Sequence, residues 1–159
     1  MGAGYSLDRI DRKILANLQA DGRLTNQALA ERVALSPSAC LVRVRRLEQA
    51  GVIQGYHARL DPFRLNAGLV LFAEIRLKAH GAADLTKFDE AIAQIPQIVE
   101  ASHVSGDYDY LLKVVVADLA EWSRIGERLT APEVGADRIN THVLLSKSKI
   151  FVGYPVATG

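Results

Sequence analysis

A short turn in the second half of the chain gathers side chains that suit a small charged ligand. Gly106 lies between Ser105 and the run Asp107, Tyr108, Asp109. A glycine permits a positive φ angle and close approach of backbone to a ligand. Residues two apart in an extended segment point the same way, so both carboxylates face one side. With free amides of the turn, they suit the α-ammonium and α-carboxylate groups of an amino acid. The alternative is a hairpin in which Asp107 caps its own turn and Asp109 is solvated.

A second stretch, residues 25–51, predicts two short helices joined by a tight corner. Ser36 can cap the second helix with its hydroxyl while Pro37 takes the first helical position, where a missing N–H costs nothing. At helical spacing, one face of this helix is apolar and the other is polar and basic. This is the helix-turn-helix arrangement, whose second helix enters the major groove of DNA. An ordinary helical hairpin with a solvated basic face is the alternative.

The outer face of the second helix supplies groups for DNA recognition. Arginine can hold guanine through two hydrogen bonds, and an exposed valine can contact a thymine methyl. We expect base edges to be contacted by Ser38, Val42, Arg45 and Arg46, with Ala39 beside them in the same interface. Phosphates are bound by cations near the helix and by amides at its start. The residues expected in this role are Arg23, Ser36 and Arg43.

The sequence offers little support for catalysis or metal binding. The carboxylates of the turn could act with His103 and His142 in acid/base chemistry or metal binding. However, the chain has no HExxH motif, no Ser/His/Asp set and no phosphate-binding glycine loop. Both histidines also fall in predicted strands. We therefore expect that the protein is not an enzyme and holds no metal and no cofactor, and that its effector is an amino acid.

Charge is distributed unevenly along the 159 residues. Residues 1–60 hold nine Lys/Arg against five Asp/Glu, and residues 61–159 hold ten against thirteen. A basic first part suits a polyanion, whereas the acidic remainder argues against DNA wrapping by the whole chain. We therefore expect two functions in two parts of the chain.

Cysteine use and hydropathy indicate a cytoplasmic protein. Cys40 is the only cysteine, so no intrachain disulfide can form, and its place on the apolar helix face predicts a buried residue. No apolar run approaches the roughly 18 residues of a membrane span, and no signal-peptide pattern opens the chain. We expect no membrane partner.

The elements that must position these residues fall into two groups. Residues 7–20 predict a first helix that packs behind helices at 25–33 and 36–50, and residues 56–60 predict a short strand or wing. Beyond a linker the pattern changes to strands and helices. The expected elements are a strand at 68–79, a helix at 85–95, strands at 98–105 and 108–117, a helix at 119–129 and a strand at 138–150.

The order βαββαβ, with right-handed crossovers, predicts a four-stranded antiparallel sheet with two helices on one face. The fold class is therefore α+β. It combines a three-helix, winged helix-turn-helix domain at 1–60, with its hinge strand, a linker at 61–67 and a ferredoxin-like domain for ligand sensing and oligomerisation at 68–159.

The second face of that sheet is expected to be apolar in places, notably at residues 69–73 and 111–116. An open apolar face must be covered, most simply by a copy of itself. We therefore expect a homodimer. Two helix-turn-helix units related by a two-fold axis would read half-sites of a pseudo-palindromic double-stranded DNA site about 34 Å apart, or a multiple of that.

Three separated motifs carry a family resemblance: the run LDRIDRKILANLQADGRLTNQALAERVALSPSACLVRVRRLEQAGVIQGYHARLDP, then VSGDYDYLLKVVV, then THVLLSKSK. The chain resembles the Lrp/AsnC transcription factors over residues 7–149. The resemblance implies an amino-acid effector, and dimers that often assemble into octamers. It places the recognition helix on residues 36–50 and the ligand loop on residues 105–109, with Thr141 lining the same pocket. Three residues depart from the family pattern: Ala39, Asn66 and Lys147.

The expected function is a sequence-specific, effector-responsive DNA-binding transcriptional regulator. The alternatives are an architectural DNA-binding protein without an effector and a stand-alone metabolite-binding module. An architectural protein would bind mixed DNA nearly as well as an operator, and a metabolite module would show no salt-dependent DNA affinity.

Overall fold

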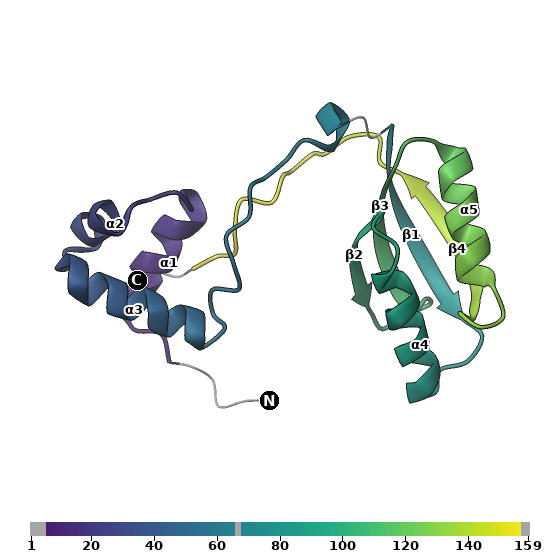
Figure 1. Cartoon of the computed structure of the whole chain (residues 1–159), viewed down its shortest axis with the longest axis horizontal. Helices are drawn as coiled ribbons and strands as arrows, with labels where there is room; N and C mark the ends of the chain where they lie inside the picture. The colour runs from purple at the N-terminus through teal and green to yellow at the C-terminus, as the bar shows by residue number, and fades with distance from the viewer. Residues whose placement is uncertain (1–5, 66–67, 157–159) are drawn as a thin grey trace. The chain divides into compact units, whose positions relative to one another are not determined.

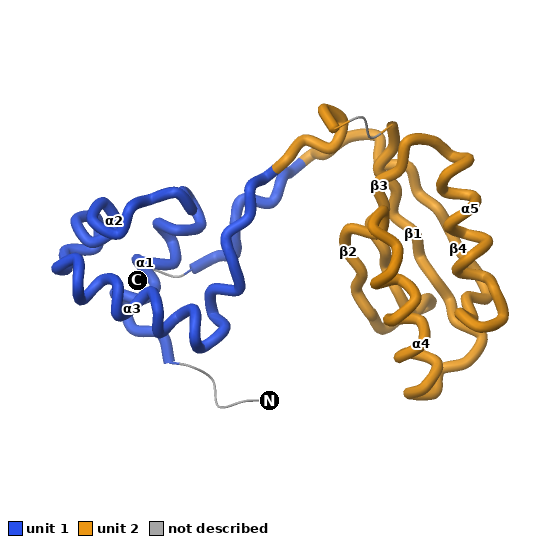
Figure 2. The backbone as a smooth tube through the Cα atoms, viewed as in Figure 1, with its two compact units in different colours: residues 1–59, 149–159 blue, residues 60–148 orange. Residues whose placement is uncertain are grey.

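The computed structural model describes residues 6–65 and 68–156 (Figure 1). The chain divides into two compact units, coloured separately in Figure 2. Unit 1 comprises residues 1–59 and 149–159, and unit 2 comprises residues 60–148. The C-terminal segment thus groups with the first unit, whereas the sequence assigned it to the second domain. The expected linker at 61–67 lies partly outside the described residues, at 66 and 67.

The described residues of unit 1 form three helices whose starts are each capped by a side chain: α1 (Arg9–Ala20), α2 (Asn26–Val33) and α3 (Pro37–Gln49). Asp8 accepts a hydrogen bond from the Asp11 amide at 2.7 Å, and Asp11 reaches back to the Asp8 amide at 3.3 Å, completing a capping box. Ser36 accepts from the Ala39 amide at 3.2 Å. The predicted Ser-Pro helix start is confirmed.

A tight corner packs the three helices around one small core. Ala34 ends α2 in the left-handed conformation, with φ +57°, so that α3 begins only three residues later. The core is formed by Ile14, Leu29, Ala30, Val33, Cys40 and Leu47. Cys40 is fully buried, as predicted. The corner leaves the other side of α3 exposed.

Residues 56–60, where a short strand or wing was expected, form no strand in this chain. After Gly51, whose φ of +68° ends α3, the described residues form no strand before the 3-10 helix η1 (Pro62–Leu65). A strand needs a neighbour to pair its amides and carbonyls. The segment is extended and exposed but has no strand beside it within the described chain.

Unit 2 has the predicted βαββαβ order. Its elements are β1 (Leu69–Leu77), α4 (Ala82–Ala93), β2 (Ile98–His103), β3 (Tyr110–Val116), α5 (Leu119–Thr130) and β4 (Ala136–Val143). All pairings are antiparallel in the order β2-β3-β1-β4, with α4 and α5 packed on one face (Figure 1). The ferredoxin-like fold is confirmed.

β4 ends at Val143, seven residues before the predicted end at residue 150. Val143 pairs with Leu71, and the Leu144 amide donates to the Val70 carbonyl at 2.9 Å. Because β1 begins at Leu69 and runs antiparallel, this register leaves the residues beyond Leu145 without a strand beside them. The end of β4 is therefore set by where β1 begins.

The face of the sheet opposite the helices, here called the outer sheet face, is mixed in character. Along β3, buried residues alternate with the half-buried Leu111, Lys113 and Val115. Phe72 pairs with Lys113 and His142 on the same side. The outer sheet face thus contains the predicted apolar residues, but charged residues lie between them.

Candidate functional site: a charged cleft and a recognition helix

A cleft of about 340 Å³ opens in unit 2 where the turn between β2 and β3 meets the outer sheet face. Its lining residues are Glu74, Arg76, Gly106, Asp107, Tyr108, Asp109, Arg138 and Asn140. Gly106 has φ +133°, and the space where a Cβ atom would lie is open. The turn can therefore present its backbone directly to a ligand.

Strand pairing concentrates charge in this cleft. β1 and β4 place Arg76 opposite Arg138 and Glu74 opposite Asn140. Asn140 Nδ2 donates to Glu74 Oε2 at 3.3 Å, and His142 Nε2 lies 3.4 Å from Glu74 Oε1. Like charges directly opposite each other on a sheet are unfavourable. A bound anion such as a carboxylate would relieve this repulsion and accept hydrogen bonds from the guanidiniums.

The two aspartates of the turn have different environments. Asp109 Oδ2 accepts a hydrogen bond from the Leu77 amide at 2.7 Å, and His80 Nε2 lies 3.2 Å from the same carboxylate. Its side chain is only 17% exposed, whereas Asp107 is exposed. Asp109 therefore holds the end of β1 as well as lining the cleft, and Asp107 is the more accessible carboxylate.

The structure brings together most of the residues predicted for the ligand site. Gly106, Asp107, Tyr108 and Asp109 all line the cleft, while Ser105 directly precedes it without lining it. Thr141 lies elsewhere: it pairs with buried Ala73 and accepts a hydrogen bond from Trp122 Nε1 at 2.9 Å. That places Thr141 on the side of β4 that faces α5, away from the cleft.

Four lining residues were not predicted: Glu74, Arg76, Arg138 and Asn140. The available signal was the alternation of charged with apolar residues near the end of β1, in the run AEIRL. In a strand this alternation places the charged residues on one face. Which residues of β4 join them depends on register, which no local pattern gives.

The polar face of α3 presents most of the residues expected to read DNA. Ser38, Ala39 and Arg45 are exposed, and Val42 is 67% exposed. A large apolar side chain left this open on a basic helix suits contact with a thymine methyl group. Arg23 is also exposed, in the turn after α1, where its amide donates to Asp21 Oδ1 at 2.9 Å.

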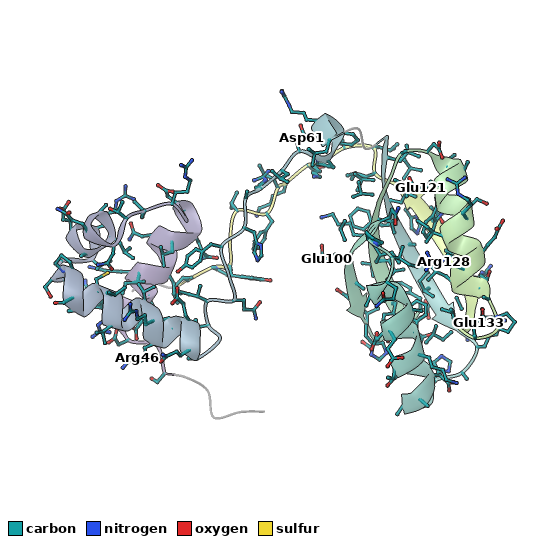
Figure 3. All side chains as sticks on the ribbon, viewed as in Figure 1. Arg46, Asp61, Glu100, Glu121, Arg128 and Glu133 are labelled. Carbon is teal, nitrogen blue, oxygen red and sulfur yellow. The ribbon has the colours of Figure 1, made fainter. Side chains whose placement is uncertain are left out.

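Two arginines of α3 instead contact α1, forming what we call the Asp–Arg cluster (Asp8, Asp11, Arg43 and Arg46). Arg43 Nη1 lies 2.6 Å from Asp8 Oδ2 and 2.8 Å from Asp11 Oδ1. Arg46 Nη2, on α3 (Figure 3), lies 3.3 Å from Asp11 Oδ2. Asp11 is fully buried, a position that a carboxylate tolerates only when paired.

The pKa values follow from these contacts. The hydrogen bond from the Asp11 amide, followed by that from Arg43, lowers the pKa of Asp8 below its ordinary value. The hydrogen bonds to Asp8 and then to Asp11 raise the pKa of Arg43 above its already high value. Both shifts favour the charged forms, so Asp8 and Arg43 form an ion pair.

The histidines considered for a metal have other neighbours. His103 stacks on Tyr110 with ring centroids 4.9 Å apart, and His142 lies beside Glu74. Among residues 6–65 and 68–156, no group of three or more His, Cys, Asp or Glu is arranged to hold a metal ion. In the same part of the chain, no helix has the length and apolar character needed to span a bilayer.

Comparison with known families matches both units. A family described as winged helix-turn-helix DNA-binding matches residues 7–54, and one described as Lrp/AsnC ligand binding domain matches residues 70–152. The fold and the two sites thus define a DNA-binding regulator with an attached ligand-binding unit. The chain belongs to the Lrp/AsnC family of transcriptional regulators.

Similar proteins agree with this assignment. The leucine-responsive regulatory proteins of Klebsiella pneumoniae and Escherichia coli K12 are each 47% identical over 148 residues, covering 92% of this chain and 89% of theirs. A transcriptional regulator of Neisseria meningitidis, solved in complex with L-Met, has a TM-score of 0.86 at 33% identity, covering 96% of this chain and 98% of its own. The prediction of a regulator rather than an enzyme is confirmed.

Proposed function

We propose that this regulator senses an amino acid in the cleft at the Gly106 turn, and that binding shifts its DNA affinity or its assembly. The observation that carries the proposal is the gathering of two arginines, three carboxylates and an open glycine around one cleft. Guanidiniums suit the α-carboxylate of an amino acid, and carboxylates suit its ammonium group. The L-Met complex of the Neisseria meningitidis relative supports this class of effector.

On the DNA side, we assign base-edge contacts to Ser38, Val42, Arg45 and Arg46, with Ala39 beside them. Phosphate contacts are assigned to Arg23 and to the helix start at Ser36, but not to Arg43, whose guanidinium is already paired with two carboxylates. Exposure of most of this face of α3 supports the assignment.

For assembly, we propose a homodimer formed through the outer sheet face, as a step toward an octamer in the cytoplasm. The half-buried Phe72, Leu111 and Val115 support this, because apolar side chains on an open sheet gain stability when a second copy covers them. A dimer would present two α3 helices to a pseudo-palindromic site. An effector changes this assembly only as far as it binds one state better than another.

The effector site is tested by titrating the full chain with each of the twenty amino acids in a calorimeter. Arg138→Ala should abolish the binding seen with the wild type. Arg138 faces Arg76 across the strands, so its removal relieves repulsion and should leave the fold intact. Arg128→Ala, which removes an arginine from α5 in the same unit (Figure 3), is the matched control and should bind normally. Equal binding by the two variants, or no binding by the wild type, contradicts the proposal.

The DNA interface is tested with Arg45→Ala on an operator and on a mixed-sequence duplex at one salt concentration. If Arg45 holds a guanine through two hydrogen bonds, the operator alone should lose about 1–3 kcal/mol. An equal loss on both duplexes would make Arg45 a phosphate contact. Wild-type protein that binds both duplexes alike would instead favour an architectural DNA-binding protein.

Sedimentation velocity tests the assembly. The wild type should sediment as a dimer or a larger oligomer, and the effector found by calorimetry should shift its sedimentation coefficient. A monomer at micromolar concentration would rule out the outer sheet face as a stable dimer interface.

A further inference from the structure

The Asp–Arg cluster joins the first helix of unit 1 to its recognition helix. Both carboxylates are also held in place by contacts that involve no arginine, because Asp8 and Asp11 form the capping box of α1. They therefore present fixed acceptors to the side of α3. Arg43 uses one nitrogen, Nη1, to contact both of them.

This arrangement resembles the way in which arginine binds a phosphate group, because the Arg43 guanidinium faces two anionic oxygens, at 2.6 and 2.8 Å. The Arg43 side chain is 27% exposed, and its charge is already compensated. An arginine that bound a DNA phosphate would have to give up these contacts. The gain from the phosphate would then be offset by a carboxylate left unpaired.

We infer that Asp8 and Asp11 are positioning residues that keep Arg43 on the protein and orient Arg46, and so limit how many α3 cations neutralise DNA phosphates. The inference rests on α3 facing DNA, as proposed above. Pairing of Arg43 with the carboxylates should increase specificity. Phosphate contacts strengthen binding to every DNA sequence, so an arginine kept from the phosphates lowers non-specific affinity. Arg45, exposed on the same helix, remains available for bases.

The test measures how the affinity of the full chain for a mixed-sequence duplex falls with salt. Each phosphate neutralised contributes about 0.9 to the slope of log affinity against log salt. Asp11→Asn is the obvious variant, but Asp11 is fully buried and its loss can unfold the unit. Asp8→Asn is the better choice, because asparagine caps a helix as well as aspartate does.

Asp8→Asn removes the negative charge that lies 2.6 Å from Arg43 Nη1, so the positive charge of Arg43 becomes more available to a phosphate. The slope should steepen by about 0.9, which is an additional loss of about threefold between roughly 50 and 200 mM salt. Asp21→Asn is the matched control, because it removes one exposed carboxylate of unit 1 whose acceptor role an amide can keep. Its slope should equal that of the wild type. Adding Arg43→Gln to Asp8→Asn should remove the gain.

Two results would overturn the inference while leaving the interface in place. One is an equal slope for Asp8→Asn and Asp21→Asn while Arg45→Ala still weakens operator binding. The other is a slope reduced by about 0.9 in Arg43→Gln alone, because Arg43 would then already neutralise a phosphate. If Arg45→Ala has no effect on any duplex, α3 does not face DNA and both the interface and the inference fail.

Discussion

Replacing Asp109 with alanine should weaken both the ligand site and the sheet, whereas replacing Asp107 should weaken only the site. The largely buried Asp109 carboxylate accepts the Leu77 amide at 2.7 Å. A hydrogen bond to a charged group contributes about 1.5–3 kcal/mol, and Asp109→Ala would leave that amide at the end of β1 without its acceptor. At exposed Asp107, substitution usually changes stability by less than about 0.5 kcal/mol.

Urea unfolding followed by tryptophan fluorescence measures this difference. Trp122 is the only tryptophan and is buried in unit 2, so its signal reports the unit that contains both aspartates. With a urea dependence of about 1–3 kcal/mol per molar, a loss of about 2 kcal/mol lowers the midpoint by about 1 M. Calorimetry should show weaker effector binding for both variants. Equal unfolding midpoints for the two variants would refute a structural role for Asp109.

Three further outcomes follow from single contacts. Burial raises the pKa of Tyr110 to about 12. Because the pKa of tyrosine in the unfolded chain is lower, the stability that neutral Tyr110 contributes should be lost as the pH rises from about 10 to 12. Tyr110→Phe should remove this pH dependence in unfolding measurements. Gly153 has φ +125°, and Gly153→Ala would place a Cβ atom 2.7 Å from Gln19 Oε1. The Tyr154 amide donates a hydrogen bond to that oxygen at 2.6 Å. Because the new Cβ would displace the oxygen, hydrogen exchange of the Tyr154 amide should become faster. Gly126 lies inside α5, where an added Cβ atom would come no closer than 4.0 Å to the Ile139 side chain. Because alanine favours a helix more than glycine does, Gly126→Ala should stabilise unit 2 by about 0.5–1 kcal/mol in urea unfolding.

Helix starts and the element order could be predicted because their causes are local. The hydroxyl of Ser36 and the ring of Pro37 act within one turn of chain, and the structure places the start of α3 there. The same holds for the break at Gly51. Strand ends were less predictable, since β4 stops where β1 ceases to provide a neighbour, and that depends on pairing across the sheet.

The roles of charged residues on α3 show a second limit. Helical spacing separates an apolar face from a polar one, but it does not say which cations are already paired. Arg43 and Arg45 are two residues apart on one helix, yet Arg43 contacts carboxylates more than thirty positions earlier in the chain, whereas Arg45 is exposed. Only the packing of α1 against α3 distinguishes them.

Register decides the composition of the cleft in the same way. Because side chains alternate along a strand, a shift of one residue in the pairing of β4 would exchange its two faces. Arg138 and Asn140 would then point toward the helices, and Thr141 would join Glu74 on the outer sheet face. The observed register brings a second arginine opposite Arg76 and leaves Thr141 with Trp122. The turn at Gly106 therefore marks where a ligand site lies, and the pairing of β1 with β4 determines which charges meet the ligand there.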